Sequence, residues 1–327
     1  MYLLSNYISS PGNTLEVLKK NSIILRKTRG QNFLTDTNIL KKITRASGTG
    51  SDDTVLEIGS GIGSLTEILA QKAKKVICIE IDRNLIKIFN ENFSEPARAS
   101  LKKKIILIED DAMKADLQKL NKKHHFTMVV SNLPYKVAAP LILKILTEVP
   151  GLKNMLLTIQ KDIAERLLSK PGDKYYSSYC VKSNFLADFK ILFSVPRNCF
   201  FPVPNIDSVV IEAVPENISS SNIKAEDLGQ FFSFIDHCFA HRRKKLVNSL
   251  RAAFRSSSGF GYNHLDSSEE RNRLDKNIDK KDLMVKMLRV IGKGADIRAE
   301  NLSIQEFVML FLSLKSISDE TGKNKKI

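Results

Sequence analysis

The feature that most constrains the fold is a glycine-rich turn between an apolar run and a helical pattern. Residues 59–63 read GSGIG, the run Thr54–Ile58 (TVLEI) precedes them, and a helix is predicted to begin at Leu65. A buried strand that ends in glycines and leads into a helix is typical of an open, doubly wound α/β sheet. Glycines in such a turn permit positive φ angles and let a ligand approach the backbone closely. The pattern therefore predicts a ligand-binding α/β domain.

The alternation of strand and helix continues to about residue 160. The predicted strands are Val76–Glu80, Ile105–Glu109, Met128–Ser131 and Asn154–Gln160, and the predicted helices are Asn84–Asn92 and Pro140–Thr147. This order indicates a parallel sheet of the Rossmann-like type. Beyond Phe185, two extended segments flank a proline-rich loop and predict an antiparallel addition at the sheet edge, Phe189–Ser194 and Ser208–Val214.

The C-terminal part of the chain has a different pattern. After Pro215, the polar stretch ENISSSN is typical of a linker. The predicted helices beyond it are Leu228–Phe239, Arg242–Phe254, Lys281–Val290 and Ser303–Leu314. A chain of 327 residues suggests two domains, at roughly 100–200 residues per domain. We expect an N-terminal leader over 1–28, an α/β domain over 29–215 and a smaller helical domain over 216–327.

Acidic residues stand where two of the predicted strands end. Ligands of open α/β sheets bind at the carboxyl ends of the strands. A carboxylate at Glu80 can accept hydrogen bonds from a ribose diol, and one at Asp111 can accept from an adenine amino group. A dinucleotide fingerprint would need glycine where this chain has Ser64, so the spacing favours S-adenosyl-L-methionine (SAM) over NAD. The predicted SAM contacts at these elements are Gly59, Gly61, Gly63, Glu80 and Asp111.

The sequence Asn132-Leu133-Pro134-Tyr135 follows the fourth predicted strand. The exocyclic amine of adenine is a poor nucleophile because its lone pair is delocalised into the ring. The Asn132 side-chain oxygen and the Leu133 carbonyl are candidates to accept its two N–H groups and favour a tetrahedral nitrogen. Pro134 stiffens the loop and removes a competing donor. Tyr135 is predicted to stack on the base.

Several segments together resemble the ribosomal small-subunit RNA adenine dimethyltransferase family of the KsgA type. The matching segments run in the expected order from about residue 26 to 315: GQNFL at Gly30–Leu34, EIGSGIGSLT at Glu57–Thr66, EID at Glu80–Asp82, NLPY at Asn132–Tyr135, QKDIAER at Gln160–Arg166, FFPVPNIDS at Phe200–Ser208, RRKKLVNSL at Arg242–Leu250 and RAENLS at Arg298–Ser303.

The resemblance implies roles for particular residues. Gln31, Asn32 and Leu34 correspond to the segment that closes over SAM, and Asn132 lies between the cofactor and the target base. Phe200 corresponds to the aromatic residue that sandwiches the target adenine with Tyr135. The implied reaction is dimethylation of two adjacent adenosines near the 3′ end of 16S RNA, in a precursor of the 30S subunit.

The charge of the chain points to a polyanionic partner. There are 51 Lys and Arg against 36 Asp and Glu, a formal net charge of +15. Residues 240–255 contain basic side chains and no acid, and phosphate contacts from such a face would dominate affinity for RNA. The predicted RNA-binding residues are Arg242, Arg243, Lys244, Lys245 and Arg251.

Other functions remain as alternatives. A large-subunit adenine methyltransferase of the macrolide-resistance type shares the core motifs, although RAENLS favours the small subunit. A non-catalytic assembly factor is opposed by the intact motif residues, and an NAD oxidoreductase by Ser64 and NLPY. The pair His237 and His241 has helical spacing, but methyl transfer from SAM needs no metal and we expect none. We expect a cytoplasmic monomer with no membrane partner.

Overall fold

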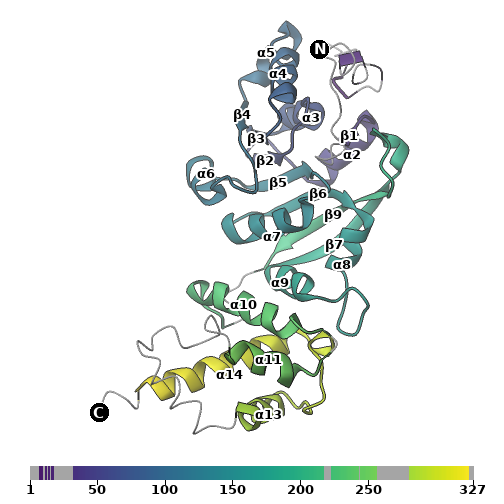
Figure 1. Cartoon of the computed structure of the whole chain (residues 1–327). Helices are drawn as coiled ribbons and strands as arrows, with labels where there is room; N and C mark the ends of the chain where they lie inside the picture. The colour runs from purple at the N-terminus through teal and green to yellow at the C-terminus, as the bar shows by residue number, and fades with distance from the viewer. Residues whose placement is uncertain are drawn as a thin grey trace. The chain divides into compact units, whose positions relative to one another are not determined.

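The computed structural model describes residues 7–9, 12, 14, 16–17, 32–216, 222–242, 244–255 and 280–323. The chain forms two compact units, and Figure 1 shows its elements in order along the chain. The first unit comprises Met1–Glu165 with Ala187–Pro215, and the second comprises Arg166–Leu186 with Glu216–Ile327. Among the described residues, no helix has both the length and the apolar character that crossing a membrane requires.

A seven-stranded sheet forms the centre of the first unit, in the order β4-β3-β2-β5-β6-β9-β7. Five strands are parallel: β2 (Thr54–Ile58), β3 (Lys75–Glu80), β4 (Ile105–Glu109), β5 (Met128–Asn132) and β6 (Asn154–Gln160). The last two, β7 (Ala187–Val195) and β9 (Ser208–Pro215), are antiparallel to their neighbours. The strand order reverses between β2 and β5, which makes a topological switch point there. The predicted doubly wound sheet with an antiparallel addition is confirmed.

Helices cover the sheet on both sides in the doubly wound manner. They are α2 (Thr37–Ala46), α3 (Ser64–Lys72), α4 (Arg83–Asn92), α5 (Ala99–Lys102), α6 (Leu117–His124), α7 (Ala138–Glu148) and α8 (Lys161–Leu167). The sequence predicts α3, α4 and α7, whereas α2, α5, α6 and α8 were not predicted. α2 and α6 are short and rich in polar residues, with three buried residues in α2 and one in α6. Their start is marked by the Asp36 and Asp116 caps, whose carboxylates accept backbone N–H groups.

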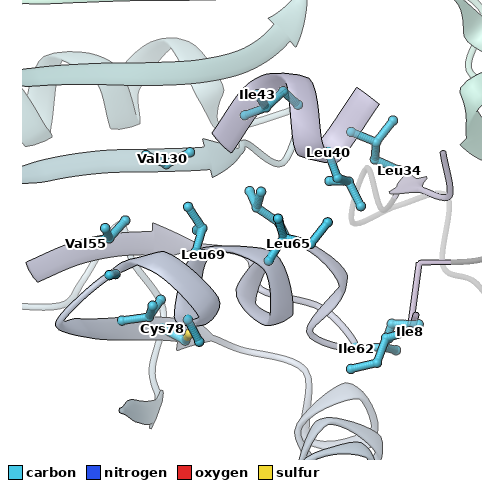
Figure 2. Close-up of a cluster of buried hydrophobic side chains, with 14 of the residues drawn as sticks. Ile8, Leu34, Leu40, Ile43, Val55, Ile62, Leu65, Leu69, Cys78 and Val130 are labelled. Carbon is cyan, nitrogen blue, oxygen red and sulfur yellow. The ribbon is translucent and has the colours of Figure 1, made fainter. Parts of the chain in front are cut away.

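A cluster of buried apolar side chains joins the sheet to α2 and α3 (Figure 2). Val55, Cys78 and Val130 contribute from three adjacent strands, and Leu69 contributes from α3. Ile8, from the N-terminal segment predicted as a leader, is part of the same core. The described part of that segment is therefore packed on the first unit.

A buried ion pair fixes the N-terminal segment to α3. The Ile8 N–H donates to Glu67 Oε2 at 2.9 Å, and Arg98 Nε donates to Glu67 Oε1 at 2.7 Å. Both Glu67 and Arg98 are buried. The Thr14 hydroxyl donates to the Ile8 carbonyl and closes the turn.

The second unit is helical and has an aromatic core. Its helices are α9 (Ser178–Leu186), α10 (Leu228–Phe239), α11 (Leu246–Arg255), α13 (Lys280–Val290) and α14 (Ile304–Lys323). The segment 166–186 was assigned to the α/β domain in the sequence analysis, yet it groups with these helices. Phe185 packs on Phe231 with centroids 4.7 Å apart, and the Tyr176 hydroxyl donates to the Leu302 carbonyl.

The predicted start of one helix was wrong. The sequence analysis began it at Arg242, but α11 begins at Leu246. Lys244 N–H closes a turn onto the His241 carbonyl, and Leu246 N–H donates to the Ile297 carbonyl. Because Leu246 and Val247 are buried, helix geometry starts where the apolar residues pack, and Arg242 and Lys244 lie in the turn before it.

Candidate active site

A cavity of about 300 Å³ opens at the carboxyl ends of β2 to β5, at the switch point of the sheet. Open α/β sheets bind their ligands in this position. Predicted site residues that line it are Asn32, Leu34, Gly59, Gly61, Glu80, Asp111, Asn132, Leu133 and Pro134. The cavity therefore brings most of the predicted cofactor contacts together.

The glycine turn forms one wall of the cavity. Gly59 and Gly61 have φ angles of 74° and 58°. A Cβ atom at Gly59 would lie 3.2 Å from Pro134 Cγ, and one at Gly61 would lie 3.0 Å from Phe33 Cε1. Glycine is thus required for conformation and for space, and it leaves backbone exposed to the cavity.

Gly63 has a different role from its two neighbours. It does not line the cavity. It precedes α3 with a φ of 94°, and a Cβ there would lie 2.5 Å from Phe93 Cε2. In this structure Gly63 lets α3 pack closely on the aromatic side chains of α4.

The Glu80 carboxylate is held by three backbone N–H groups at the end of β3. Oε2 accepts from Gly61 at 2.9 Å, and Oε1 accepts from Ile81 and Asp82 at 3.0 Å. Burial raises the pKa of Glu80, and these N–H groups partly offset the rise. A carboxylate has about four acceptor positions, so acceptor capacity remains for a ligand in the cavity.

An apolar surface lies between Glu80 and Asp111. Ile81 is 50% exposed, and it lines the cavity with Ala112 and Met113. Asp111 accepts the Met113 N–H at 2.9 Å, which fixes the loop after β4. The sequence analysis did not select Ile81. The sequence signal that could have identified Ile81 is its position. It is a large apolar residue directly after the acid that ends a strand, where exposure to solvent would favour a polar side chain.

Asn132 lines the cavity and has a side-chain acceptor that is not used. Its Nδ2 donates to the Asn32 carbonyl at 3.0 Å, which fixes the amide. Its Oδ1 is buried, and within the described residues it has no hydrogen-bond partner. The Leu133 N–H donates to the Thr158 carbonyl, so the loop backbone is anchored to β6. An unpaired buried acceptor costs about 1–3 kcal/mol, and a ligand donor in the cavity would recover that free energy.

Tyr135 and Phe200 contact each other directly. Their ring centroids are 6.4 Å apart with an interplanar angle of 67°, an edge-to-face contact. The Tyr135 hydroxyl and Ser208 Oγ share a hydrogen bond of 2.7 Å. Phe200 lies on β8 (Phe200–Phe201), which pairs with β1 (Phe33–Leu34). Both rings are buried and neither lines the cavity, so they enclose no space for a base in this arrangement.

Three charged residues of the cavity were absent from the predicted site: Asp110, Lys136 and Glu57. Lys136 follows Tyr135, is exposed and lines the cavity. Glu57 also lines it, but this side chain is fully buried and accepts a hydrogen bond from the Thr66 hydroxyl at 2.6 Å. Burial raises the pKa of Glu57 to about 8. Its strand position within an apolar run gave no signal that it would border a ligand.

The predicted RNA-binding residues are partly engaged inside the second unit. Arg242 Nε donates to Glu300 Oε2 at 2.8 Å, and Lys245 pairs with Asp296. Lys244 is exposed. Gln31, Arg243 and the side chain of Arg251 lie outside the described residues.

Comparison with known proteins identifies the family. The model of the family described as "Ribosomal RNA adenine dimethylase" matches residues 24–276 of this chain. The chain belongs to this family.

The family's relatives match nearly the whole chain. "Ribosomal RNA small subunit methyltransferase A" of Geobacillus thermodenitrificans (strain NG80-2) is 36% identical over 307 residues, which cover 93% of this chain and 95% of the relative. The protein of the same name from Bacillus mycoides (strain KBAB4) is 33% identical, and the match covers 93% of this chain and 96% of that relative. The predicted family and enzyme class, an rRNA adenine dimethyltransferase, are therefore confirmed.

Solved structures of related proteins share the fold. A dimethyladenosine transferase from Plasmodium falciparum matches with a TM-score of 0.67 and 28% identity, covering 87% of this chain and 98% of that one. A 23S rRNA methyltransferase, ErmE, matches with a TM-score of 0.56 at 22% identity, covering 86% and 99%. As a member of the dimethylase family, the chain is a methyltransferase and uses a methyl donor.

Proposed function

We propose that this chain uses SAM to dimethylate N6 of two adjacent adenosines in the 3′-terminal hairpin of small-subunit ribosomal RNA. The small-subunit target comes from the names of its relatives, which cover more than nine-tenths of the chain. The single observation that carries the chemistry is the buried, unpartnered Asn132 Oδ1 at the cavity wall.

The cavity residues fit the three parts of SAM. The Glu80 carboxylate accepts from the ribose hydroxyls, and Asp111 faces the adenine amino group beside the apolar surface of Ile81. The exposed backbone at Gly59 and Gly61 lies along the methionine part, with Asn32 and Leu34 over it. When bound, SAM supplies a methyl group on an activated, positively charged sulfur. The carboxylates of Glu80, Asp110 and Asp111 favour binding of a cation.

Asn132 and Leu133 position the target amine. Asn132 Oδ1 and the Leu133 carbonyl accept the two N–H groups, which directs the nitrogen lone pair towards the methyl carbon. The new N–C bond forms as the bond from carbon to sulfur breaks, its electron pair stays on sulfur, and the amine proton passes to solvent. Because the methyl group is already activated, the protein contributes position and preorganised acceptors.

Tyr135 and Phe200 come from separate elements, the loop after β5 and strand β8. We propose that their rings part when the target base enters and stack on its two faces. Lys244 and Arg251, with Arg242, Arg243 and Lys245, supply phosphate contacts from the second unit. The proposed partner is a precursor of the 30S subunit, which this chain binds as a monomer in the cytoplasm.

The test is methyl transfer from labelled SAM to unmethylated small subunits, with large subunits in parallel. We expect N6,N6-dimethyladenosine in small-subunit RNA. Asn132→Ala should lower the rate of methyl transfer by about 10²–10³-fold while SAM still binds. This is the usual effect of removing one preorganised polar group from an active site. Asn90→Ala, at an exposed position of α4, is the matched control and should transfer normally. Label only in large-subunit RNA would refute the proposed target, and SAM binding without any transfer would support an assembly factor.

A further inference from the structure

Lysines stand at or just before the start of four of the parallel strands. Lys74 and Lys75 introduce β3, and Lys103 and Lys104 precede β4. The remaining members are Lys122 and Lys123 before β5, and Lys153 before β6. Because the strands are parallel, all these loops lie at the amino edge of the sheet, opposite the edge that bears the cavity. We call these seven residues the lysine edge.

Backbone hydrogen bonds join these loops into one continuous row. Val76 N–H donates to the Lys104 carbonyl at 2.9 Å, and Lys74 N–H donates to the Asp53 carbonyl at 2.9 Å. Lys153 N–H donates to the Thr127 carbonyl at 2.7 Å. Five adjacent strands at about 4.8 Å spacing place the row across ~19 Å.

The charges of the row act on each other. Burial lowers the pKa of His124, at the end of α6, and the positive charges of Lys123 and Lys75 lower it further. The end of α6 therefore lies close to the start of β3. The lysine edge therefore combines positive charges from several elements. It is not the solvated face of a single helix.

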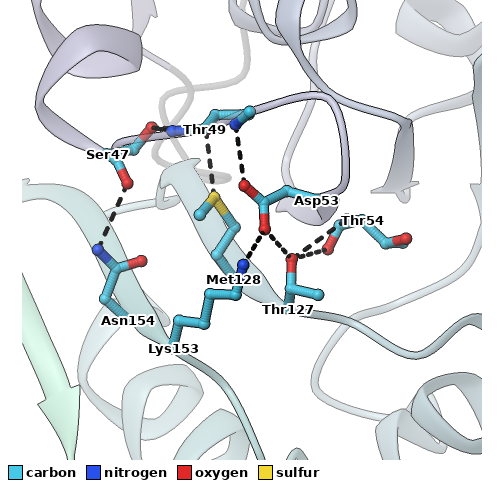
Figure 3. A network of polar contacts seen from close by, with 9 residues as sticks. Ser47, Thr49, Asp53, Thr54, Thr127, Met128, Lys153 and Asn154 are labelled. Atoms are coloured by element: carbon cyan, nitrogen blue, oxygen red, sulfur yellow. Dashed lines mark hydrogen bonds and ion pairs between the residues drawn. The ribbon is translucent and has the colours of Figure 1, made fainter.

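Few acids offset this field. The buried Asp53 accepts from Lys153 Nζ at 2.7 Å, from the Gly50 N–H and from the Thr127 hydroxyl (Figure 3). Lys104 Nζ donates to the carbonyls of Ala70 and Ala73 at the end of α3. Asp52 is exposed before β2.

Four lysines of the row have free ammonium groups. Lys74, Lys103, Lys122 and Lys123 are exposed, and within the described part of the chain they form no ion pair. Their ammonium groups are therefore available to a ligand.

We propose that the lysine edge binds the phosphate backbone of a double-helical RNA segment that is separate from the methylated nucleotides. Phosphates are the ligands that a row of lysines suits. The described loops expose no Phe, Tyr or Trp side chain on which single-stranded bases would stack, and His125 is their only exposed aromatic ring. They also expose no large apolar residue of the kind that anchors a protein to a lipid surface. The partner is therefore duplex RNA, held at a second face of a protein whose family acts on ribosomal RNA.

The test replaces three of the four free lysines together, as Lys74→Gln, Lys103→Gln and Lys123→Gln. The matched control replaces three exposed lysines elsewhere that form no ion pair within the described residues, Lys87, Lys170 and Lys286, with glutamine. The probe is an RNA duplex of about 20 base pairs without the target hairpin, whose affinity is measured against salt. This readout does not depend on methyl transfer, so it is independent of the proposed function.

Each lost phosphate contact should reduce the slope of log K against log salt by about 0.9, which is about eightfold in affinity at 0.1 M salt. The triple variant should therefore lose up to about 500-fold in affinity, with its slope lower by about 2.7, and the control triple should lose far less. SAM binding should be unchanged in both variants, which shows that they are folded. Equal losses in the two triples would overturn the proposal, because net charge alone would then explain them. Loss of binding to anionic vesicles without loss of RNA affinity would also overturn it.

Discussion

Gly63→Ala tests whether the turn before α3 is set by packing rather than by ligand contact. The φ of Gly63 is 94°, and holding a non-glycine residue in the left-handed region costs about 1–2 kcal/mol. The new Cβ would lie 2.5 Å from Phe93 Cε2 and 3.1 Å from two ring atoms of Phe89. Both rings are buried and in contact, with centroids 4.6 Å apart, so they have little room to move. Overpacking of this kind costs about 1–3 kcal/mol. The expected loss is about 2–5 kcal/mol.

Gly48→Ala is the matched control. Its φ is 69°, but a Cβ there would meet no atom within 4 Å. It should lose only the backbone part, about 1–2 kcal/mol. Because the chain has no tryptophan, urea denaturation should be followed by far-ultraviolet circular dichroism. Equal losses in the two variants would show that the overlap with Phe93 is relieved at no cost, and the packing argument for Gly63 would be refuted.

Three further substitutions test other features of the first unit. Glu67→Ala should destabilise the protein by about 1–3 kcal/mol in thermal unfolding, because the buried Arg98 keeps Glu95 but loses Glu67, and the Ile8 N–H loses its acceptor; an unchanged melting temperature would exclude this ion pair as a structural link. Lys136→Gln should raise KM for the subunit without changing SAM affinity in calorimetry, and a loss of SAM affinity would move Lys136 to the donor site. The pKa of Glu57 is about 8, above its ordinary value of 4.5, so its stabilising effect is complete below about pH 4.5 and is lost as the pH rises through 8. Stability should fall by about 1.4 kcal/mol per pH unit between these values, and Glu57→Gln should remove this slope in denaturation curves; an unaltered slope would contradict the raised pKa.

The parallel strands could be predicted because strands that are buried on both faces appear in the sequence as short runs of apolar residues. β2 and β3 show this pattern, and their bounds agree closely with the prediction. A short, mostly polar helix such as α6 has a weaker signal. α6 buries only Leu117, and its start depends on the Asp116 cap. α11 begins where Leu246 packs, which depends on the Ile297 carbonyl far along the chain.

Some residues of the candidate site could likewise be predicted from the sequence, and others could not. Glu80, Asp111 and Asn132 follow predicted strands, and the parallel sheet alone brings such positions to one edge. The roles of Gly63 and Phe200 depend on side chains that approach from elsewhere in the chain, Phe93 in one case and Tyr135 in the other. The sequence around Gly63 or Phe200 does not indicate which distant side chain will pack against it. Ile81 and Glu57 border the cavity for the same reason, through tertiary placement.

The two edges of the parallel sheet have opposite charge, and this bears on how one protein binds two unlike ligands. Glu80, Asp110 and Asp111 line the cavity at the carboxyl edge, where they favour a cationic methyl donor and repel phosphate. RNA therefore gains little attraction from the cavity itself. The net charge of +15 must act from other surfaces, and the lysine edge places part of it at the amino ends of the same strands. In the proposed function the acids would select the donor and the lysine edge would hold the polyanion, so that the target base would reach Asn132 without its phosphates entering the acidic cavity.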